Sequence, residues 1–182
     1  MRLSRSRIQE FLRDWLGITL SVGCIHQCIG EGGRAVAPLE EALVAEIQQA
    51  DLLHADETGW KEKGHLLWLW VLRTATVTLY LIGRRHWDVI APSLKGFSGW
   101  LMSDGYGQFT NNVAEQSLRH WVIARKISHG TRTPEGSRAF ALLASVIDTC
   151  RQRGLSPWPY LAQVIAARRQ GNAAPPIPQP IG

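Results

Sequence analysis

A strand-rich stretch between residues 52 and 103, with helical patterns on both sides of it, most constrains how this chain can fold. Residues 52–55, 66–73, 77–82 and 99–103 form short runs rich in Leu, Val, Trp and Tyr, a composition typical of β-strands. The short connection between the second and third runs favours antiparallel pairing, and residues 87–94 predict a connecting helix interrupted by Pro92. We therefore expect an α/β fold with a sheet of about four strands.

The first 50 residues predict a separate helical segment. An amphipathic helix ends at Gly17, Ser21 can cap a second helix that ends at Gly30, and Pro38 begins a third. The first two helices match the helix-turn-helix pattern, in which the second helix can enter a DNA major groove. A plain helical hairpin gives the same pattern, so both interpretations stay open.

The last third of the chain also predicts helices. One begins at residue 111 or 112 and runs to about residue 125, and a basic loop follows it to residue 132. Thr133 caps a long helix that ends at Gly154, and Ser156 begins the last helix. Residues 172–182 are rich in proline, which predicts a disordered tail.

The charge of the chain is unevenly distributed. Residues 111–171 carry nine Lys and Arg against three Asp and Glu, whereas the rest of the chain is balanced. This excess favours contact with a polyanion such as nucleic acid, or else a solubilising surface. Apolar runs are too short to span a membrane, and the N-terminus lacks the pattern of a secretory signal, so we expect a cytoplasmic protein without membrane contact.

Two aspartates follow the first and fourth strand-like runs directly. Asp56 ends the first run and Asp104 ends the fourth. Three antiparallel strands, a helix and a fourth strand, with these two acids, is the order of a ribonuclease H-like core, in which the fourth strand lies beside the first. Adjacent carboxylates repel unless a cation lies between them, and Mg²⁺ prefers such oxygen ligands. The alternative is that both are ordinary turn residues.

Glu115 is a third acid with two interpretations. It stands three residues after Asn112 at a helix start, which is the capping-box pattern, and four residues before Arg119, which is an ordinary helical ion pair. From the local pattern alone, the cap is the simpler reading.

Four strings carry a resemblance to a known family: HADETGW, GWLMSDGYG, TNNVAEQSLRHWVIARK and GTRTPEGSRAFALLASVIDTC. In this order they resemble the transposases of the insertion sequence 66 family, from about Arg7 to Gly171. The resemblance implies a DDE catalytic domain of ribonuclease H-like fold over residues 51–171. It also implies DNA cleavage and transfer between insertion-sequence ends and target DNA, with Mg²⁺ or Mn²⁺ held by Asp56, Asp104 and Glu115.

The sequence departs from the family pattern in two places. Asp104 and Glu115 are only 11 positions apart, where family members carry a long segment that includes a further strand. This predicts an internal deletion near residues 109–110 that removes the fifth strand. The chain also starts without the N-terminal region expected of a full-length member.

These departures leave three hypotheses for the function. The first is an active transposase domain. The second is an inactive remnant that binds DNA or full-length transposase, and the third is a ribonuclease H-like nuclease acting on other nucleic acids. The main candidate partner is DNA, and a second copy of the chain or full-length transposase is a further candidate. The candidate phosphate contacts are Arg119, Arg125, Lys126, Arg132 and Arg138.

Overall fold

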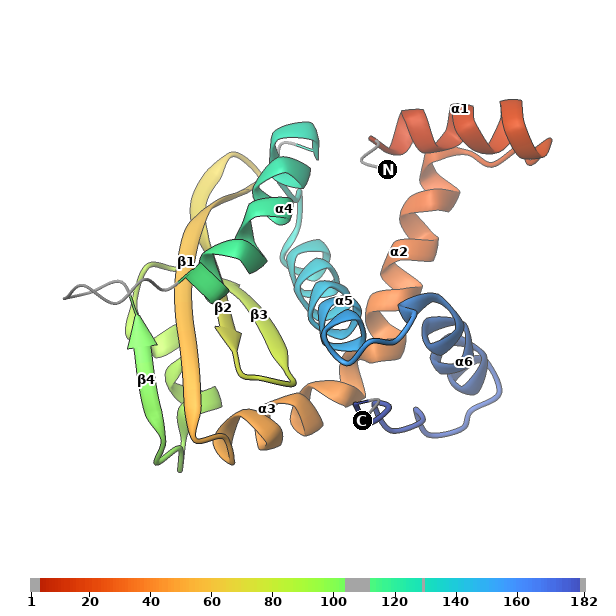
Figure 1. Ribbon diagram of the computed structural model, residues 1–182. Coiled ribbons are helices and arrows are strands. Elements are labelled where there is room, and N and C mark those ends of the chain that lie inside the picture. The colour runs from red at the N-terminus through yellow and green to blue at the C-terminus, as the bar shows by residue number, and fades with distance from the viewer. Residues whose placement is uncertain (1–3, 104–111, 129, 181–182) are drawn as a thin grey trace.

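The computed structural model describes residues 4–103, 112–128 and 130–180, and its centre is a mixed four-stranded sheet (Figure 1). The strands are β1 (Leu52–Glu62), β2 (His65–Arg73), β3 (Thr78–Gly83) and β4 (Trp100–Ser103), in the order β3-β2-β1-β4. β2 is antiparallel to both β1 and β3, whereas β4 is parallel to β1. The prediction that the fourth strand lies beside the first is therefore confirmed.

β1 is much longer than the sequence pattern predicts. The expected end at Asp56 is wrong, because β2 pairs with β1 without interruption as far as Glu62. A tight turn follows, in which Lys63 and Gly64 have positive φ angles of 50° and 87°. Asp56 consequently lies inside a strand rather than in a turn.

The N-terminal helices are α1 (Arg5–Leu16), α2 (Val22–Val36), the short 3₁₀ helix η1 (Ala37–Leu39) and α3 (Glu40–Gln48). As predicted, α1 ends at Gly17, which has a positive φ of 64°, and Ser21 caps α2 by accepting from the N–H of Cys24 at 3.0 Å. The predicted end of α2 at Gly30 is wrong. The helix continues to Val36 because Gly32 and Gly33 are buried in its contact with a later helix.

The remaining elements are η2 (Trp87–Val89), η3 (Ala91–Leu94), α4 (Asn112–Ser128), α5 (Pro134–Gln152) and α6 (Pro157–Arg169). The single helix predicted over residues 87–94 is thus two 3₁₀ turns, and α4 extends three residues beyond its predicted end. Thr133 caps α5 as expected, since its hydroxyl accepts from the N–H of Gly136 at 3.0 Å. Within the described ranges, no helix is long and apolar enough to cross a membrane.

α5 is the central helix of the molecule. It packs on β3 with one side and against α2 and α6 with the other, whereas α4 lies across β1 and β2 (Figure 1). α2 crosses α5 closely at Gly33, where an added Cβ would lie 2.7 Å from the Cα of Ala139. Only a residue without a side chain permits this approach of α2 to α5.

Two buried clusters cover the two faces of the sheet. The larger one joins Leu53, Ala55, Trp70 and Leu72 to apolar residues of α2, α3, α5 and α6. The smaller one joins one face of the sheet to α4 and α5 and consists of Trp60, Leu69, Val71, Tyr80, Ala114, Leu118, Ala141 and Ala144. Alternation along β1 therefore places Asp56 on the face of the smaller cluster.

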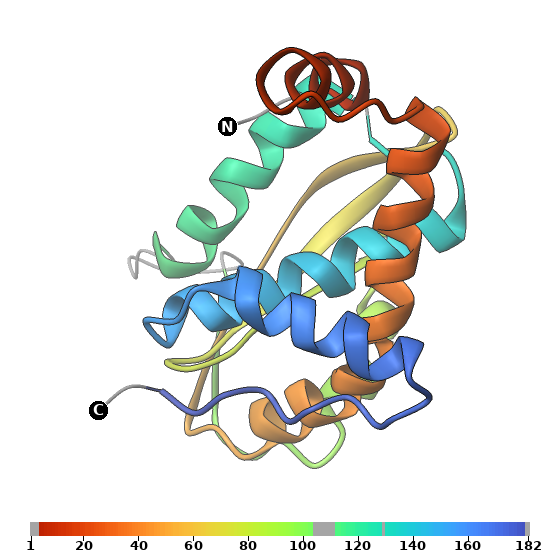
Figure 2. The ribbon, with the colours of Figure 1, turned by 90° about the vertical axis from the view of Figure 1, so that its right-hand side faces the viewer.

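The C-terminal segment (residues 172–180) forms neither helix nor strand, but it has a fixed course beside α6 and towards α3 (Figure 2). The sequence predicts a disordered tail here. In the structure, Ile177 is only 5% exposed and belongs to the larger buried cluster. The proline-rich composition did not reveal this apolar anchor.

We predict that Gly33→Ala destabilises the protein by about 2 kcal/mol, because the new methyl group would force α2 away from Ala139 of α5. The matched control is Gly23→Ala in the same helix, where the added Cβ meets its nearest neighbour, the hydroxyl of Ser21, at an ordinary 3.6 Å. That change should be neutral or stabilise the protein by up to about 1 kcal/mol. Urea unfolding of both variants measures the difference, and equal free energies of unfolding would contradict the close-packing argument.

Candidate functional site

Asp56 is positioned by β1 and half-buried on the sheet face that α4 covers. Its carboxylate accepts a hydrogen bond from the N–H of Glu57 at 2.7 Å. Its cross-strand partner on β2 is Val71, which is fully buried in the smaller cluster. One side of Asp56 therefore meets the packed part of the sheet.

Glu57 points to the opposite face of the same strand and has a separate set of contacts. Its carboxylate pairs with Arg85 at 3.0 Å, and the Arg85 guanidinium lies 4.4 Å from the ring centre of Trp68. Adjacent carboxylates on β1 thus belong to different environments, as strand alternation requires.

The parallel pairing of β1 with β4 stops just before the two aspartates. Its last pair of residues is Ala55 with Ser103, so Asp56 and Asp104 are the next residues in their respective chains. Asp104 itself lies outside the described residues. Its predicted place beside Asp56 is therefore still a prediction.

Glu115 lies in the first turn of α4, next to the helix face that packs on the sheet. Ala114 and Leu118 are buried in the smaller cluster, whereas the Glu115 side chain is 53% exposed. Its carboxylate accepts from the guanidinium of Arg119 at 3.2 Å, so the expected helical ion pair is present. The Asn112 side chain lies outside the described part of the chain, so the capping box stays a prediction.

The structure thus brings Asp56 and the helix that carries Glu115 to one face of the sheet, whereas Asp104 lies outside the described residues. Ala114, the neighbour of Glu115, shares a buried cluster with Val71, the neighbour of Asp56 across the ladder. Among the described residues, no three His, Cys, Asp or Glu side chains are grouped so that they could hold a metal ion. The predicted set includes Asp104 and is not tested by that observation.

A polar network fixes α4 on the sheet and was not foreseen from the sequence. Asp148 of α5 accepts hydrogen bonds from the Tyr80 hydroxyl at 2.9 Å and from the Trp121 indole at 2.8 Å. The Tyr80 hydroxyl is also within 3.0 Å of the Ser117 carbonyl, and Arg73 donates to the Ser117 hydroxyl at 2.5 Å. Burial and the nearby Asp148 carboxylate raise the pKa of Tyr80, so the phenol stays protonated and can donate.

The start of α5 is fixed to the end of β1 by a second group of polar contacts. Thr131 forms a parallel bridge with Glu62, and its hydroxyl accepts from the Trp60 indole at 3.0 Å. Ser137 of α5 bonds to the Thr131 hydroxyl at 2.6 Å and donates to the Glu62 carboxylate. The stretch that leads into α5 is thereby held against the end of β1.

The five basic residues predicted to contact DNA differ in what they bind within the protein. Arg119 pairs with Glu115, and Arg138 pairs with Glu40 at 2.6 Å. Lys126 and Arg132 are exposed, and the Arg125 side chain lies outside the description. Since Lys126 follows Glu115 by eleven residues of helix, it lies about 16 Å further along the α4 axis. The five basic residues are therefore spread from α4 to the start of α5, and they do not form one group beside Asp56 and Glu115.

Comparisons with known proteins give one family. The family model described as "Transposase IS66 family" matches residues 2–110. The uncharacterized protein y4qI of Sinorhizobium fredii (strain NBRC 101917 / NGR234) is 29% identical over 105 residues, which cover 58% of this chain and 18% of that protein. The uncharacterized protein y4jO of the same organism is 36% identical over 66 residues, which cover 36% of this chain and 20% of that protein. The matched regions thus span a fifth or less of these relatives, and no solved structure matches the chain.

We predict that Asp148→Ala destabilises the protein by roughly 2 kcal/mol, because the Tyr80 hydroxyl and the Trp121 indole would lose the acceptor that they share. Asp88→Ala is the matched control, since Asp88 is exposed and pairs only with nearby surface groups, so its loss should be below about 1 kcal/mol. Thermal unfolding and hydrogen exchange of the α4 amides measure both effects. Unchanged exchange in α4 of the Asp148 variant would show that the network does not hold this helix.

Proposed function

The chain belongs to the IS66 transposase family, and from this membership we propose that it carries the catalytic domain of a DNA transposase, which cleaves and joins DNA strands. The observation that carries the proposal is the parallel pairing of β4 with β1, because its last residue pair, Ala55 and Ser103, is followed by an aspartate in each stretch of chain. An antiparallel β1-β2-β3 unit with a fourth strand parallel to β1 is also the arrangement expected of a ribonuclease H-like core. We propose that fold for residues 51–171.

We propose that Asp56, Asp104 and Glu115 hold divalent metal, Mg²⁺ or alternatively Mn²⁺. Carboxylate oxygens are the donors that these hard cations prefer, and Asp56 and the start of α4 share one sheet face. When bound by these carboxylates, divalent metal would supply activation of the attacking hydroxyl and stabilisation of the leaving oxygen in phosphoryl transfer. The chain itself orients the Asp56 carboxylate through the N–H of Glu57, and Arg119 holds the Glu115 carboxylate when no cation does.

We further propose that the interval between the second and third acids is shortened near residues 109–110. The match to the family model ends at residue 110, next to this junction. Glu115 and the basic residues follow the junction, so their assignment depends on the sequence resemblance and on the docking of α4. The polar network around Asp148 supports that docking, because it fixes α4 to both β3 and α5.

A second candidate function is that of an inactive remnant that binds DNA or full-length transposase. The ion pair between Glu115 and Arg119 favours it, because a carboxylate already neutralised by a guanidinium has less need of a cation. Salt-sensitive DNA binding without cleavage would identify this case.

We predict that strand cleavage of insertion-sequence end DNA in Mg²⁺ or Mn²⁺ falls by more than about a hundredfold in Asp56→Asn, because an amide is a much weaker ligand for these ions. Glu57→Gln is the matched control, since Glu57 is the next residue of β1 but faces Arg85 on the other side of the sheet. Its activity should stay close to that of the unchanged chain.

The assay uses two separate substrates: DNA with the ends of the insertion sequence that encodes this chain, and an RNA–DNA hybrid. If the Asp56→Asn variant still cleaves the DNA ends, the assignment of Asp56 to the metal site is wrong. If the protein hydrolyses only the hybrid and joins no strands, its reaction is that of a nuclease and not of a transposase. No cleavage of any substrate, combined with DNA binding, would support the inactive remnant.

We also predict unequal contributions of the basic residues to DNA binding. The affinity for DNA falls as salt rises, and the steepness of this fall counts the phosphate contacts. Lys126→Ala and Arg132→Ala should each make the slope of log affinity against log salt less negative by about 0.9, the value for one phosphate contact. Arg138→Ala should have a smaller effect, because its guanidinium is already paired with Glu40. Fluorescence anisotropy with labelled duplex DNA over a series of salt concentrations measures the slopes, and an equal loss in all three variants would contradict this ranking.

A further inference from the structure

The connection between α1 and α2 holds the two helices in a fixed arrangement. The N–H of Ile18 donates to the Leu12 carbonyl at 2.9 Å, and the side-chain amide of Gln9 donates to the Leu20 carbonyl at 2.8 Å. α1 lies across the start of α2 in both views of the ribbon (Figure 1 and Figure 2). A short, bonded turn between two such helices is what the helix-turn-helix pattern requires, and it fixes the orientation of α2.

α2 has a buried face and an outer face. It packs against α5 and α6, and its buried residues are Ile25, Gly32, Gly33, Ala35 and Val36. Exposed polar side chains lie on the opposite side, where His26, Gln27 and Arg34 follow each other at helical spacing. Gly23 and Gly30 lie in line with them, and a Cβ added at Gly30 would meet the flexible Arg34 guanidinium at 3.3 Å. We call these five residues the outer face, which is polar and has little side-chain bulk at its centre.

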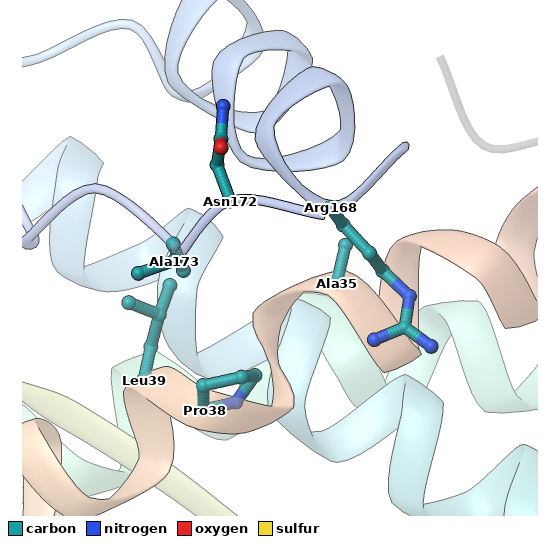
Figure 3. Close-up of a pocket in the computed structure, with 7 residues that line it drawn as sticks. Ala35, Pro38, Leu39, Arg168, Asn172 and Ala173 are labelled. Atoms are coloured by element: carbon teal, nitrogen blue, oxygen red, sulfur yellow. The ribbon is translucent and has the colours of Figure 1, made fainter. Parts of the chain in front are cut away.

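A group of arginines lies beside the outer face. Arg169 at the end of α6 forms two hydrogen bonds with the Glu31 carboxylate of α2, at 2.6 and 2.9 Å. Arg168 extends from α6 past Ala35 of α2, and its guanidinium lies 3.4 Å from the Arg34 carbonyl (Figure 3). The Arg169 hydrogen bond lowers the pKa of Glu31, and the charges of Arg34 and Arg168 lower it further. Three guanidinium groups thus surround one carboxylate, and the group keeps a positive charge.

These features match the surface of double-stranded DNA. The major groove is about 12 Å wide and admits an α-helix, and polar side chains such as Gln bind the base edges that it exposes. From His26 to Arg34 the outer face extends about 12 Å along the helix axis. Arginines beside it can bind the phosphates that flank the groove. A protein partner fits less well, because the centres of protein interfaces are apolar and aromatic, and the exposed Trp15 belongs to α1.

We propose that the outer face of α2 binds the major groove of double-stranded DNA, with His26 and Gln27 at the base edges and with Arg34 and Arg168 at phosphates. The proposal rests on the proposed function, and it assigns recognition of the insertion-sequence ends to a helix that α5 separates from β3. Recognition of base sequence and cleavage by the carboxylates then use different parts of the chain. Arg169 stays paired with Glu31 and holds α6 beside α2.

DNA binding without divalent metal tests the proposal apart from cleavage. Fluorescence anisotropy compares two labelled duplexes of equal length, one end of the insertion sequence that encodes this chain and a shuffled sequence of the same composition. The unchanged chain should bind the end duplex at least about a hundredfold more tightly than the shuffled duplex. In the double variant His26→Ala/Gln27→Ala, this ratio should fall at least about tenfold, because contacts to base edges are lost while the phosphate contacts remain.

Both changes are at exposed helix positions, where alanine favours the helix, and circular dichroism checks the fold. If the double variant is unfolded, Gln27→Glu decides the result. Its carboxylate would face the acceptor atoms of the groove and should lower the affinity for the end duplex at least about tenfold. Gln163→Glu, at an exposed position of α6, makes the same change of charge and should leave that affinity close to the unchanged value.

The phosphate contacts are tested through salt dependence. Arg34→Ala and Arg168→Ala should weaken the binding of both duplexes alike and make the slope of log affinity against log salt less negative by about 0.9 each. Arg84→Ala is the matched control, because it removes an equally charged, 82% exposed side chain that follows β3. An equal loss in the Arg84 variant would overturn the assignment of the arginines.

Cleavage assays with the same variants separate this proposal from the proposed function. Equal affinity of the unchanged chain for the two duplexes would overturn the α2 site even if the chain cleaves DNA, as would a ratio that a folded double variant leaves unchanged. Binding that depends on base sequence and requires His26 and Gln27, without any cleavage, would support the α2 site and contradict the proposed catalytic function.

Discussion

The parallel pairing of β1 with β4 is the constraint on which the arrangement of this protein depends. It joins two stretches of chain that are far apart in sequence, and it ends at Ala55 and Ser103, directly before the first two candidate acids. The antiparallel ladder with β2 continues well beyond this point, to Glu62. Asp56 therefore lies within a strand that is paired on both sides just before it, on the sheet face that α4 covers.

Polar contacts add to the apolar contacts that hold α4 on the sheet. Among the α4 side chains that the structure describes, Ala114 and Leu118 belong to the smaller buried cluster, with Trp121 partly buried beside them. Asp148 helps to fix the orientation of α4 on the sheet, because its carboxylate accepts hydrogen bonds from both Trp121 of α4 and Tyr80 of β3. This half-buried carboxylate is stable because its oxygens accept hydrogen bonds, and its removal would take an acceptor from donors on two elements.

Local patterns in the sequence predicted most element types and several caps, and failed where tertiary contacts decide. As predicted, Gly17 ends α1, and the hydroxyls of Ser21 and Thr133 cap the starts of α2 and α5. Gly30 predicts a helix end, but α2 continues because Gly33 allows close contact with Ala139, which no single-sequence pattern shows. The end of the apolar run predicts a strand end at Asp56, whereas strand pairing with β2 continues. The Asp148 network was not predicted because it joins three elements that are distant in sequence.

For the candidate site, the sequence located Asp56 and Glu115 on elements that share a sheet face, and the assignment of all three acids stays a prediction.

The buried Arg153 also has a consequence for the order in which the protein can fold. Its guanidinium requires Glu46, Thr76 and Pro178, three positions spread over most of the chain. During synthesis, the partners before it are already present when α5 emerges, but one N–H group has no acceptor until Pro178 has been added. A buried guanidinium is costly while any of its hydrogen bonds is missing. The last packing step around α3, α5 and α6 must therefore follow synthesis of the C-terminal segment, which makes this short stretch of proline-rich chain the closing element of the fold.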